Sequence, residues 1–238
     1  EFRRVLFRSI TDLASVVELS TLFLLCGTLV AHLPYNKVAE VREKNRRLGL
    51  GLMGVHEWFI QRGKKYGEDE EFKSWLGVYR GISDWASKHY SQRVSISTPV
   101  ANRAIAPTGT IGMLAGTTTG IEPIYAVAYK RRYLTGGNRW KYQYHVDHIA
   151  QEMIETYGTN PEEIESASDL ASDLERRLSF QSLVQRYVDM GISSTVNLPA
   201  YREGETNIEE TANLIAKYAQ GLRGLTFYPD GARGGQPL

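Results

Sequence analysis

Cysteine is almost absent from this chain of 238 residues, in which Cys26 is the single one. One thiol cannot form an internal disulfide, a thiolate metal site or a dithiol redox pair. Such a composition is typical of proteins from a reducing compartment, so we predict a cytoplasmic location. Because Cys26 lies in the middle of an apolar run, we interpret it as a buried structural thiol.

The net charge is also close to zero, with 28 Lys and Arg residues against 27 Asp and Glu residues. This balance gives no large field to attract nucleic acid or an anionic membrane, and we predict no nucleic-acid partner. The basic run Lys130-Arg131-Arg132 is interpreted as a solvated strand end or an ion-pair site. An anionic ligand would therefore need a local site.

Long hydrophobic runs are also rare. Residues 13–33 form the one stretch with the length of a membrane span, and Glu18 and His32 interrupt it. We predict a helix buried in a large domain and no membrane segment. Residues 1–9 are basic and apolar, but no signal-peptide cleavage site follows, so we interpret them as a non-native leader.

Helical periodicity dominates the first third of the chain, and alternation of short strands with helices follows. The pattern predicts an α/β fold with a mainly parallel sheet or barrel. The glycines of residues 48–54 are interpreted as positions of close backbone packing. The predicted helices cover residues 11–32, 36–46, 55–60, 68–91, 148–157, 170–190 and 208–220, and the predicted strands residues 104–106, 125–129, 195–198 and 225–228.

Residues 106–123 are rich in glycine and threonine and follow a predicted strand. A strand, loop and helix start in this order can direct backbone amides and hydroxyls at a phosphate. The segment lacks the Lys-Ser/Thr ending of a nucleotide-hydrolase loop, which argues against phosphoryl transfer. From the residues alone, an anion site and a ligand-free turn both remain open.

The run Ala106-Pro107-Thr108-Gly109-Thr110-Ile111 resembles the substrate loop of ribonucleotide reductase large (catalytic) subunits. The likeness is greatest to the adenosylcobalamin-dependent enzymes, class II. That family folds as a ten-stranded α/β barrel of two half-barrels. The resemblance implies that residues 10–238 are the C-terminal part of the barrel domain, its later half, with a helical N-terminal segment. Further motifs occur in the family's order at residues 45–54, 116–123, 191–199 and 228–237.

The resemblance also implies a function, the reduction of ribonucleotides to deoxyribonucleotides by thiyl-radical chemistry. The substrate, a ribonucleoside di- or triphosphate, would be held by its phosphates at Pro107, Thr108, Gly109, Thr110 and Ile111. Strand ends near Asn197 and Tyr228 would line the same cavity. A thioredoxin-like protein would supply electrons.

The family's radical and redox cysteines are expected upstream, because this chain has no Asn-x-Cys-x-Glu triplet. We therefore assign no catalytic residue to it. As an isolated fragment, without the N-terminal half of the barrel as its partner, it is predicted to be inactive.

The resemblance also bears on the cofactor, through the residue at position 227. Enzymes that import a radical from a second subunit have two adjacent tyrosines there, whereas this chain has Phe227 followed by Tyr228. Phenylalanine has no hydroxyl to relay an electron and a proton, which favours adenosylcobalamin as the radical source. Two alternatives remain, a class I large subunit with a radical-generating small subunit and a non-catalytic nucleotide-phosphate-binding module.

No metal site is expected, since His145 and His148 have no third ligand. Glu122 could orient the substrate loop or pair with a base, and we favour a role as a structural hydrogen-bond acceptor.

Overall fold

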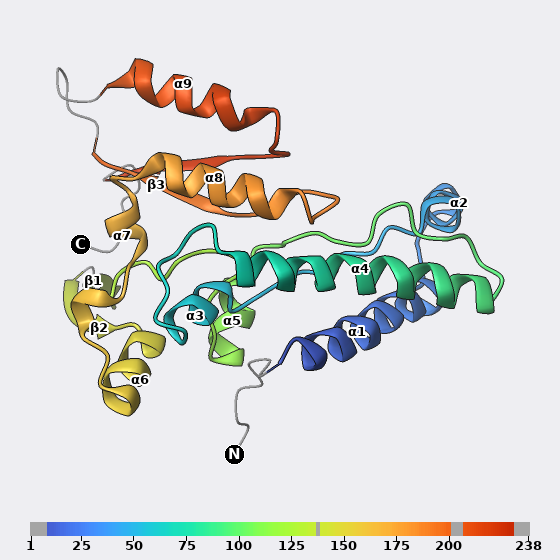
Figure 1. Cartoon of the computed structure of the whole chain (residues 1–238), viewed down its shortest axis with the longest axis horizontal. Coiled ribbons are helices and arrows are strands. Elements are labelled where there is room, and N and C mark those ends of the chain that lie inside the picture. Colours follow the sequence, from blue (N-terminus) through green and yellow to red (C-terminus); the bar gives the residue numbers. More distant parts are fainter. Residues whose placement is uncertain (1–8, 137–138, 201–206, 231–238) are drawn as a thin grey trace.

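The computed structural model describes residues 9–136, 139–200 and 207–230 (Figure 1). Residues 1–8 of the predicted leader and the glycine-rich tail after Asp230 lie outside this part. The helices are α1 (Ile10–Val30), α2 (Asn36–Asn45), α3 (Val55–Ile60), α4 (Glu70–Arg93), α5 (Gly109–Ala115), α6 (His148–Tyr157), the 3-10 helix η1 (Pro161–Glu163), α7 (Ala167–Leu170), α8 (Leu174–Gln185) and α9 (Ile208–Ala219). The strands are β1 (Ala128–Thr135), β2 (Arg139–Val146), β3 (Thr195–Leu198) and β4 (Thr226–Pro229).

Four parallel backbone segments run side by side, as the α/β prediction requires. The Leu50 amide donates to the Asn102 carbonyl at 3.0 Å, which joins the first segment to the second. The Ser193 amide donates to the Ile105 carbonyl at 2.7 Å, which joins the second to the third. The third continues into β3, which pairs in parallel with β4. These segments run in parallel, so their carboxyl ends lie at one edge.

Of the glycines of residues 48–54, Gly51 and Gly54 lie close to neighbouring chain as predicted, whereas a Cβ atom at Gly49 would meet nothing within 4 Å. A Cβ atom added to Gly51 would lie 2.8 Å from the carbonyl oxygen of Ala104, so the first two parallel segments approach too closely for a side chain there. Gly54 has φ +75°, a left-handed conformation that glycine adopts without strain.

Helix α1 packs lengthwise on α4 (Figure 1). Its N-terminus is capped by Ser9, whose hydroxyl accepts the Asp12 amide at 3.1 Å. Glu18 accepts a hydrogen bond from the α4 residue Tyr90 at 2.6 Å. Among the described residues, α1 is the one helix long and apolar enough to cross a membrane, but one side of it is buried in the protein. The residues of that side recur every fourth position: Leu13, Val17, Thr21 and Leu25.

The interpretation of Cys26 as a buried thiol is wrong, because Cys26 is exposed. It follows the buried Leu25 by one residue, a step of about 100° around a helix, which turns its side chain away from α4.

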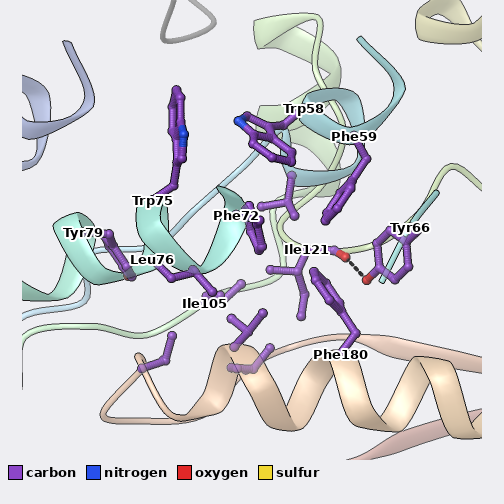
Figure 2. Packing of buried hydrophobic residues seen from close by; sticks show 14 of the residues in the cluster. Trp58, Phe59, Tyr66, Phe72, Trp75, Leu76, Tyr79, Ile105, Ile121 and Phe180 are labelled. Carbon is purple, nitrogen blue, oxygen red and sulfur yellow. Dashed lines mark hydrogen bonds between the residues drawn. The ribbon is translucent and has the colours of Figure 1, made fainter. Parts of the chain in front are cut away.

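Aromatic side chains from α3, α4 and α8 form the core behind the sheet (Figure 2). Phe180 of α8 points toward Phe72 and Tyr66, and its ring centre lies 4.5 Å from that of Tyr66. Ile105 and Ile121 pack against this cluster, so the segment that carries the predicted phosphate loop is anchored in the core on both sides of the loop.

Two predictions about secondary structure are corrected. The helix predicted over residues 170–190 is divided into α7 and α8, because Asp173 caps a new helix start by accepting the Arg176 amide at 3.2 Å. The strand predicted over residues 125–129 is instead the entry to an antiparallel hairpin, in which β1 pairs with β2 from Ala128 opposite Val146 to Thr135 opposite Arg139. Lys130-Arg131-Arg132 lies in the middle of β1 and is solvated.

Candidate functional site

The predicted phosphate loop lies at the carboxyl edge of the parallel segments. Pro107, Gly109, Thr110 and Ile111 are exposed, and Thr108 is half-buried. Helix α5 begins at Gly109, so its first amides have no acceptor within the helix. Four of the five loop residues are thus accessible to solvent, and the first amides of α5 lack an acceptor within the helix, as an anion site requires.

The loop is tied to the residues that follow α5. The Thr108 hydroxyl accepts the Gly120 amide at 3.1 Å, which closes a ring of backbone around the short helix. The carbonyl oxygen of Thr108 accepts the Gly112 amide at 2.6 Å. A Cβ atom at Gly112 would lie 3.2 Å from both the Thr117 carbonyl and the Thr119 hydroxyl, so α5 sits close to the returning chain.

Residues at the start of α3 form hydrogen bonds with the segment that follows α5. The Gly54 amide donates to the Thr118 carbonyl at 2.8 Å. The Thr117 hydroxyl donates to the buried Glu57 carboxylate at 2.5 Å. The Ile124 amide donates to Nδ1 of His56 at 2.9 Å, which leaves the ring proton on Nε2. Residues 117–124 are thus held in place by side chains and backbone from one short helix.

His56 and Tyr66 are buried beside each other under the same turn. Their ring centres lie 5.4 Å apart with the rings nearly perpendicular. Burial, and secondly the positive charge of Arg177, lower the pKa of His56 to about 3, so the imidazole is neutral. Burial raises the pKa of the Tyr66 hydroxyl, which remains protonated and donates to the Ile121 carbonyl at 2.5 Å (Figure 2).

Glu122 joins the turn to the sheet. Its carboxylate accepts the backbone amide of Thr195, the first residue of β3, at 2.9 Å. This contact agrees with the interpretation of Glu122 as a structural hydrogen-bond acceptor.

A cavity of about 1360 Å³ opens at the carboxyl ends of β3 and β4. Asn197 and Tyr228, which face each other across the β3–β4 pair, both line it. His56, Tyr125 and Asp230 are further lining residues. The expectation that these strand ends and residues 107–111 line one cavity is not met, because Asn197 and Tyr228 line this cavity and residues 107–111 do not.

Three residues near the loop were not singled out in the sequence: His56, Tyr66 and Arg177. His56 falls in the predicted helix at residues 55–60, and Tyr66 lies in a charged segment at residues 64–71 in which no pattern marks it as buried. Arg177 gave a signal that could have been used, since it lies three residues after Leu174 and three before Phe180, on the apolar side of a predicted helix. In the part of the chain that the structure describes, no group of three or more His, Cys, Asp or Glu side chains is arranged to hold a metal ion.

The family profile described as "Ribonucleotide reductase, barrel domain" matches residues 6–91 and 100–228. This chain belongs to the ribonucleotide reductase family. Among curated relatives of this ribonucleotide reductase chain, the vitamin B12-dependent ribonucleoside-diphosphate reductase of Mycobacterium tuberculosis is 29% identical, over 88% of this chain and 35% of the relative. The adenosylcobalamin-dependent ribonucleoside-triphosphate reductase of Euglena gracilis is 25% identical, over 81% of this chain and 27% of the relative.

The fold of this ribonucleotide reductase chain is likewise that of the family. The crystal structure of a B12-dependent (class II) ribonucleotide reductase superposes with a TM-score of 0.75 at 15% identity, covering 94% of this chain and 35% of that structure. This likeness confirms the predicted fold, a partial barrel. The chain spans about a third of the length of the relatives it matches.

Proposed function

We propose that this chain forms the later half of the barrel of an adenosylcobalamin-dependent ribonucleotide reductase, which converts ribonucleotides to deoxyribonucleotides. The observation that carries the proposal is the family match over residues 6–91 and 100–228. Relatives that align along most of the chain are named as B12-dependent or adenosylcobalamin-dependent reductases. The sites described above are compatible with that reaction.

The phosphate groups of the substrate are assigned to Pro107, Thr108, Gly109, Thr110 and Ile111. Four of these residues are exposed at the carboxyl edge, where ligands bind in open α/β sheets. The α5 amides and two threonine hydroxyls supply hydrogen-bond donors, and the helix start adds a small positive potential. A loop of this kind binds a phosphate without a lysine, which suits a substrate whose phosphates do not react.

The cavity at the ends of β3 and β4 is large enough for a bulky cofactor, because its volume of about 1360 Å³ exceeds that of most small-molecule sites. Tyr125, Asn197 and Tyr228 would lie against adenosylcobalamin there. When bound, this cofactor supplies a radical beside the active site. Phe227 precedes Tyr228 in β4, so this strand has no pair of adjacent phenols for a long-range radical relay.

The catalytic cysteines are assigned to segments outside this chain. Cys26 lies on α1, which packs on α4 and is far from β3 and β4 (Figure 1). A thiol in that position cannot reach a substrate held at the carboxyl edge. The first half of the barrel and a thioredoxin-like reductant are therefore the expected partners, in the cytoplasm.

The test uses the complete reductase polypeptide that carries this chain, with ribonucleoside di- or triphosphate and a dithiol reductant. Deoxyribonucleotide formation should require adenosylcobalamin, and titration with cobalamin should change its absorption spectrum. Turnover that needs a metal-containing second subunit instead would establish a class I enzyme. Nucleotide binding without any turnover would establish a non-catalytic module.

The isolated 238-residue chain serves as the matched control. It should form no deoxyribonucleotide under the same conditions, because it lacks the radical and redox cysteines. Measurable turnover by this chain alone would overturn the assignment of these cysteines to other segments.

A further inference from the structure

Among the described residues three arginines are buried, Arg46, Arg103 and Arg177, and the surroundings of Arg103 and Arg177 differ. Arg103 forms ion pairs with two carboxylates, Asp84 and Asp189, at 2.5 and 2.8 Å. Arg177 is only 2% exposed, yet in the described part of the chain no carboxylate oxygen lies within 4.0 Å of its guanidinium. Arg177 donates instead to neutral acceptors, the hydroxyl of Tyr66, the hydroxyl of Ser194 at 2.8 Å and the Thr195 carbonyl at 2.9 Å.

A buried guanidinium with no carboxylate in direct contact is costly to desolvate, by about 3 to 5 kcal/mol when a buried pair is broken, so its neutral hydrogen bonds stabilise the core little. An ion-paired or apolar side chain would stabilise the core better. The retained positive charge lies beneath the edge at which an anionic substrate is expected. After burial, its positive charge is the second cause of the lowered pKa of His56, which lines the cavity at the ends of β3 and β4.

Two hydrogen bonds connect Arg177 to the turn that follows the phosphate loop. Nη1 of Arg177 donates to the Tyr66 hydroxyl, which donates in turn to the Ile121 carbonyl at 2.5 Å. The residue before Ile121 is Gly120, whose amide donates to the Thr108 hydroxyl at 3.1 Å. Any shift of Tyr66 therefore moves the backbone to which Thr108 is tied.

The other end of the guanidinium holds the sheet. Nη2 of Arg177 donates to the carbonyl of Thr195, while the amide of Thr195 donates to Glu122. One side chain thus fixes the distance between the turn at residues 120–122 and the start of β3.

We propose that Arg177 is a positioning residue for the phosphate-binding loop, acting through the Tyr66 hydroxyl and β3. The inference rests on the proposed function, because it assumes that residues 107–111 hold the substrate's phosphates. Arg177 touches neither substrate nor cofactor in this arrangement. The hydrogen bonds that its guanidinium donates determine the position of the loop.

The test compares Arg177→Lys, Tyr66→Phe and the double variant in the complete reductase. Lysine keeps the charge but cannot donate to three separated acceptors, and phenylalanine removes the linking hydroxyl. Each single variant should raise KM for the ribonucleotide about tenfold and change kcat less than about threefold, because a displaced loop weakens phosphate binding rather than chemistry. The double variant should raise KM no further than the larger single effect, since both changes break one connection.

Arg176→Lys is the matched control. Arg176 is the neighbouring residue of α8 and pairs with Glu165 and Asp173, and lysine can keep these ion pairs. Glu165 also accepts the Tyr66 backbone amide at 2.9 Å, so the control retains that contact and leaves the Tyr66 hydroxyl untouched. The KM of the Arg176→Lys variant for the ribonucleotide should stay within about twofold of the wild-type value. Equal KM effects at 176 and 177, or additive effects of Arg177→Lys and Tyr66→Phe, would overturn the proposal.

Folding and function can be separated. If Arg177→Lys does not fold, Tyr66→Phe still decides, because an unchanged KM in that variant contradicts the connection through the hydroxyl. Failure of the positioning role leaves wild-type turnover intact, whereas failure of the proposed function removes turnover from the wild-type enzyme itself.

Discussion

The buried Arg103 forms an ion pair with the partly exposed Asp189, with Nη2 of the arginine 2.8 Å from Oδ1 of the aspartate. The Asp189 carboxylate also accepts the backbone amides of Asn102 and Arg103, at 2.8 and 3.1 Å. The pair therefore joins the parallel segment at residues 102–105 to the turn after α8, which lead into the phosphate loop and into β3.

Replacing Asp189 by Asn should destabilise the protein by about 3 kcal/mol, because the substitution leaves a buried guanidinium with less compensation. Urea unfolding measures this change in the free energy of unfolding. Glu71→Gln is the control, since the Glu71 side chain is 46% exposed in its pair with Lys64 and such pairs contribute at most about 1 kcal/mol. Equal losses in both variants would show that burial of Arg103 does not matter.

His56 should make stability fall at mildly acidic pH. Its pKa is lowered from 6.5 to about 3 in the folded state, so between these values the unfolded chain binds the extra proton. The contribution is present in full above pH 6.5 and is lost at about 1.4 kcal/mol per pH unit as the pH falls below 6.5. At about pH 5 the loss should reach about 2 kcal/mol.

His56→Asn isolates this effect, because the amide oxygen can still accept the Ile124 amide but does not titrate. Unfolding free energies of both proteins between about pH 7 and pH 5 should converge as the pH falls. Parallel curves would mean that His56 is not the group responsible.

The sequence predicted most helices because their apolar positions recur at helical spacing. The bounds of α3 and α6 were predicted as observed, and α4 begins two residues later than expected. The hairpin of β1 and β2 was missed for a physical reason. Nearly all its residues are exposed, on both faces, so the alternation of apolar and polar residues that marks a half-buried strand is missing.

The site was predictable only as far as local chemistry goes. Glycine and threonine between residues 106 and 120 indicated a loop with free donors, which the structure places at the exposed carboxyl edge. The supports of that loop come from distant residues: Tyr66 lies 55 positions from its acceptor Ile121, and Arg177 lies 111 positions from Tyr66. Contacts of this kind depend on tertiary packing, and a single sequence does not encode them in any periodic pattern.

Gly54→Ala should destabilise the protein by at least about 1 to 2 kcal/mol, the cost of a left-handed conformation for a residue with a Cβ atom. The new Cβ would also lie 2.6 Å from the Thr117 hydroxyl, which must then leave its hydrogen bond to Glu57. Gly27→Ala is the matched control, because a Cβ at that helical position of α1 meets nothing within 4 Å. That control should be stabilised by about 0.5 to 1 kcal/mol, and thermal unfolding distinguishes the two directions.

Thr108 and Thr110 should differ when each is replaced by valine, although both belong to the proposed phosphate loop. Thr108→Val removes the acceptor of the buried Gly120 amide, so it should cost about 1 to 3 kcal/mol of stability and also raise KM for the ribonucleotide. Thr110 is exposed on α5, so Thr110→Val should change stability by less than about 0.5 kcal/mol.

The KM of the Thr110→Val variant for the ribonucleotide should nevertheless rise about tenfold, because this substitution removes a hydroxyl that donates to the phosphates. Urea unfolding together with steady-state kinetics of the complete reductase gives both quantities. An unchanged KM for Thr110→Val, with a raised KM for Thr108→Val, would mean that the loop matters for its shape and that the Thr110 hydroxyl does not meet the phosphates.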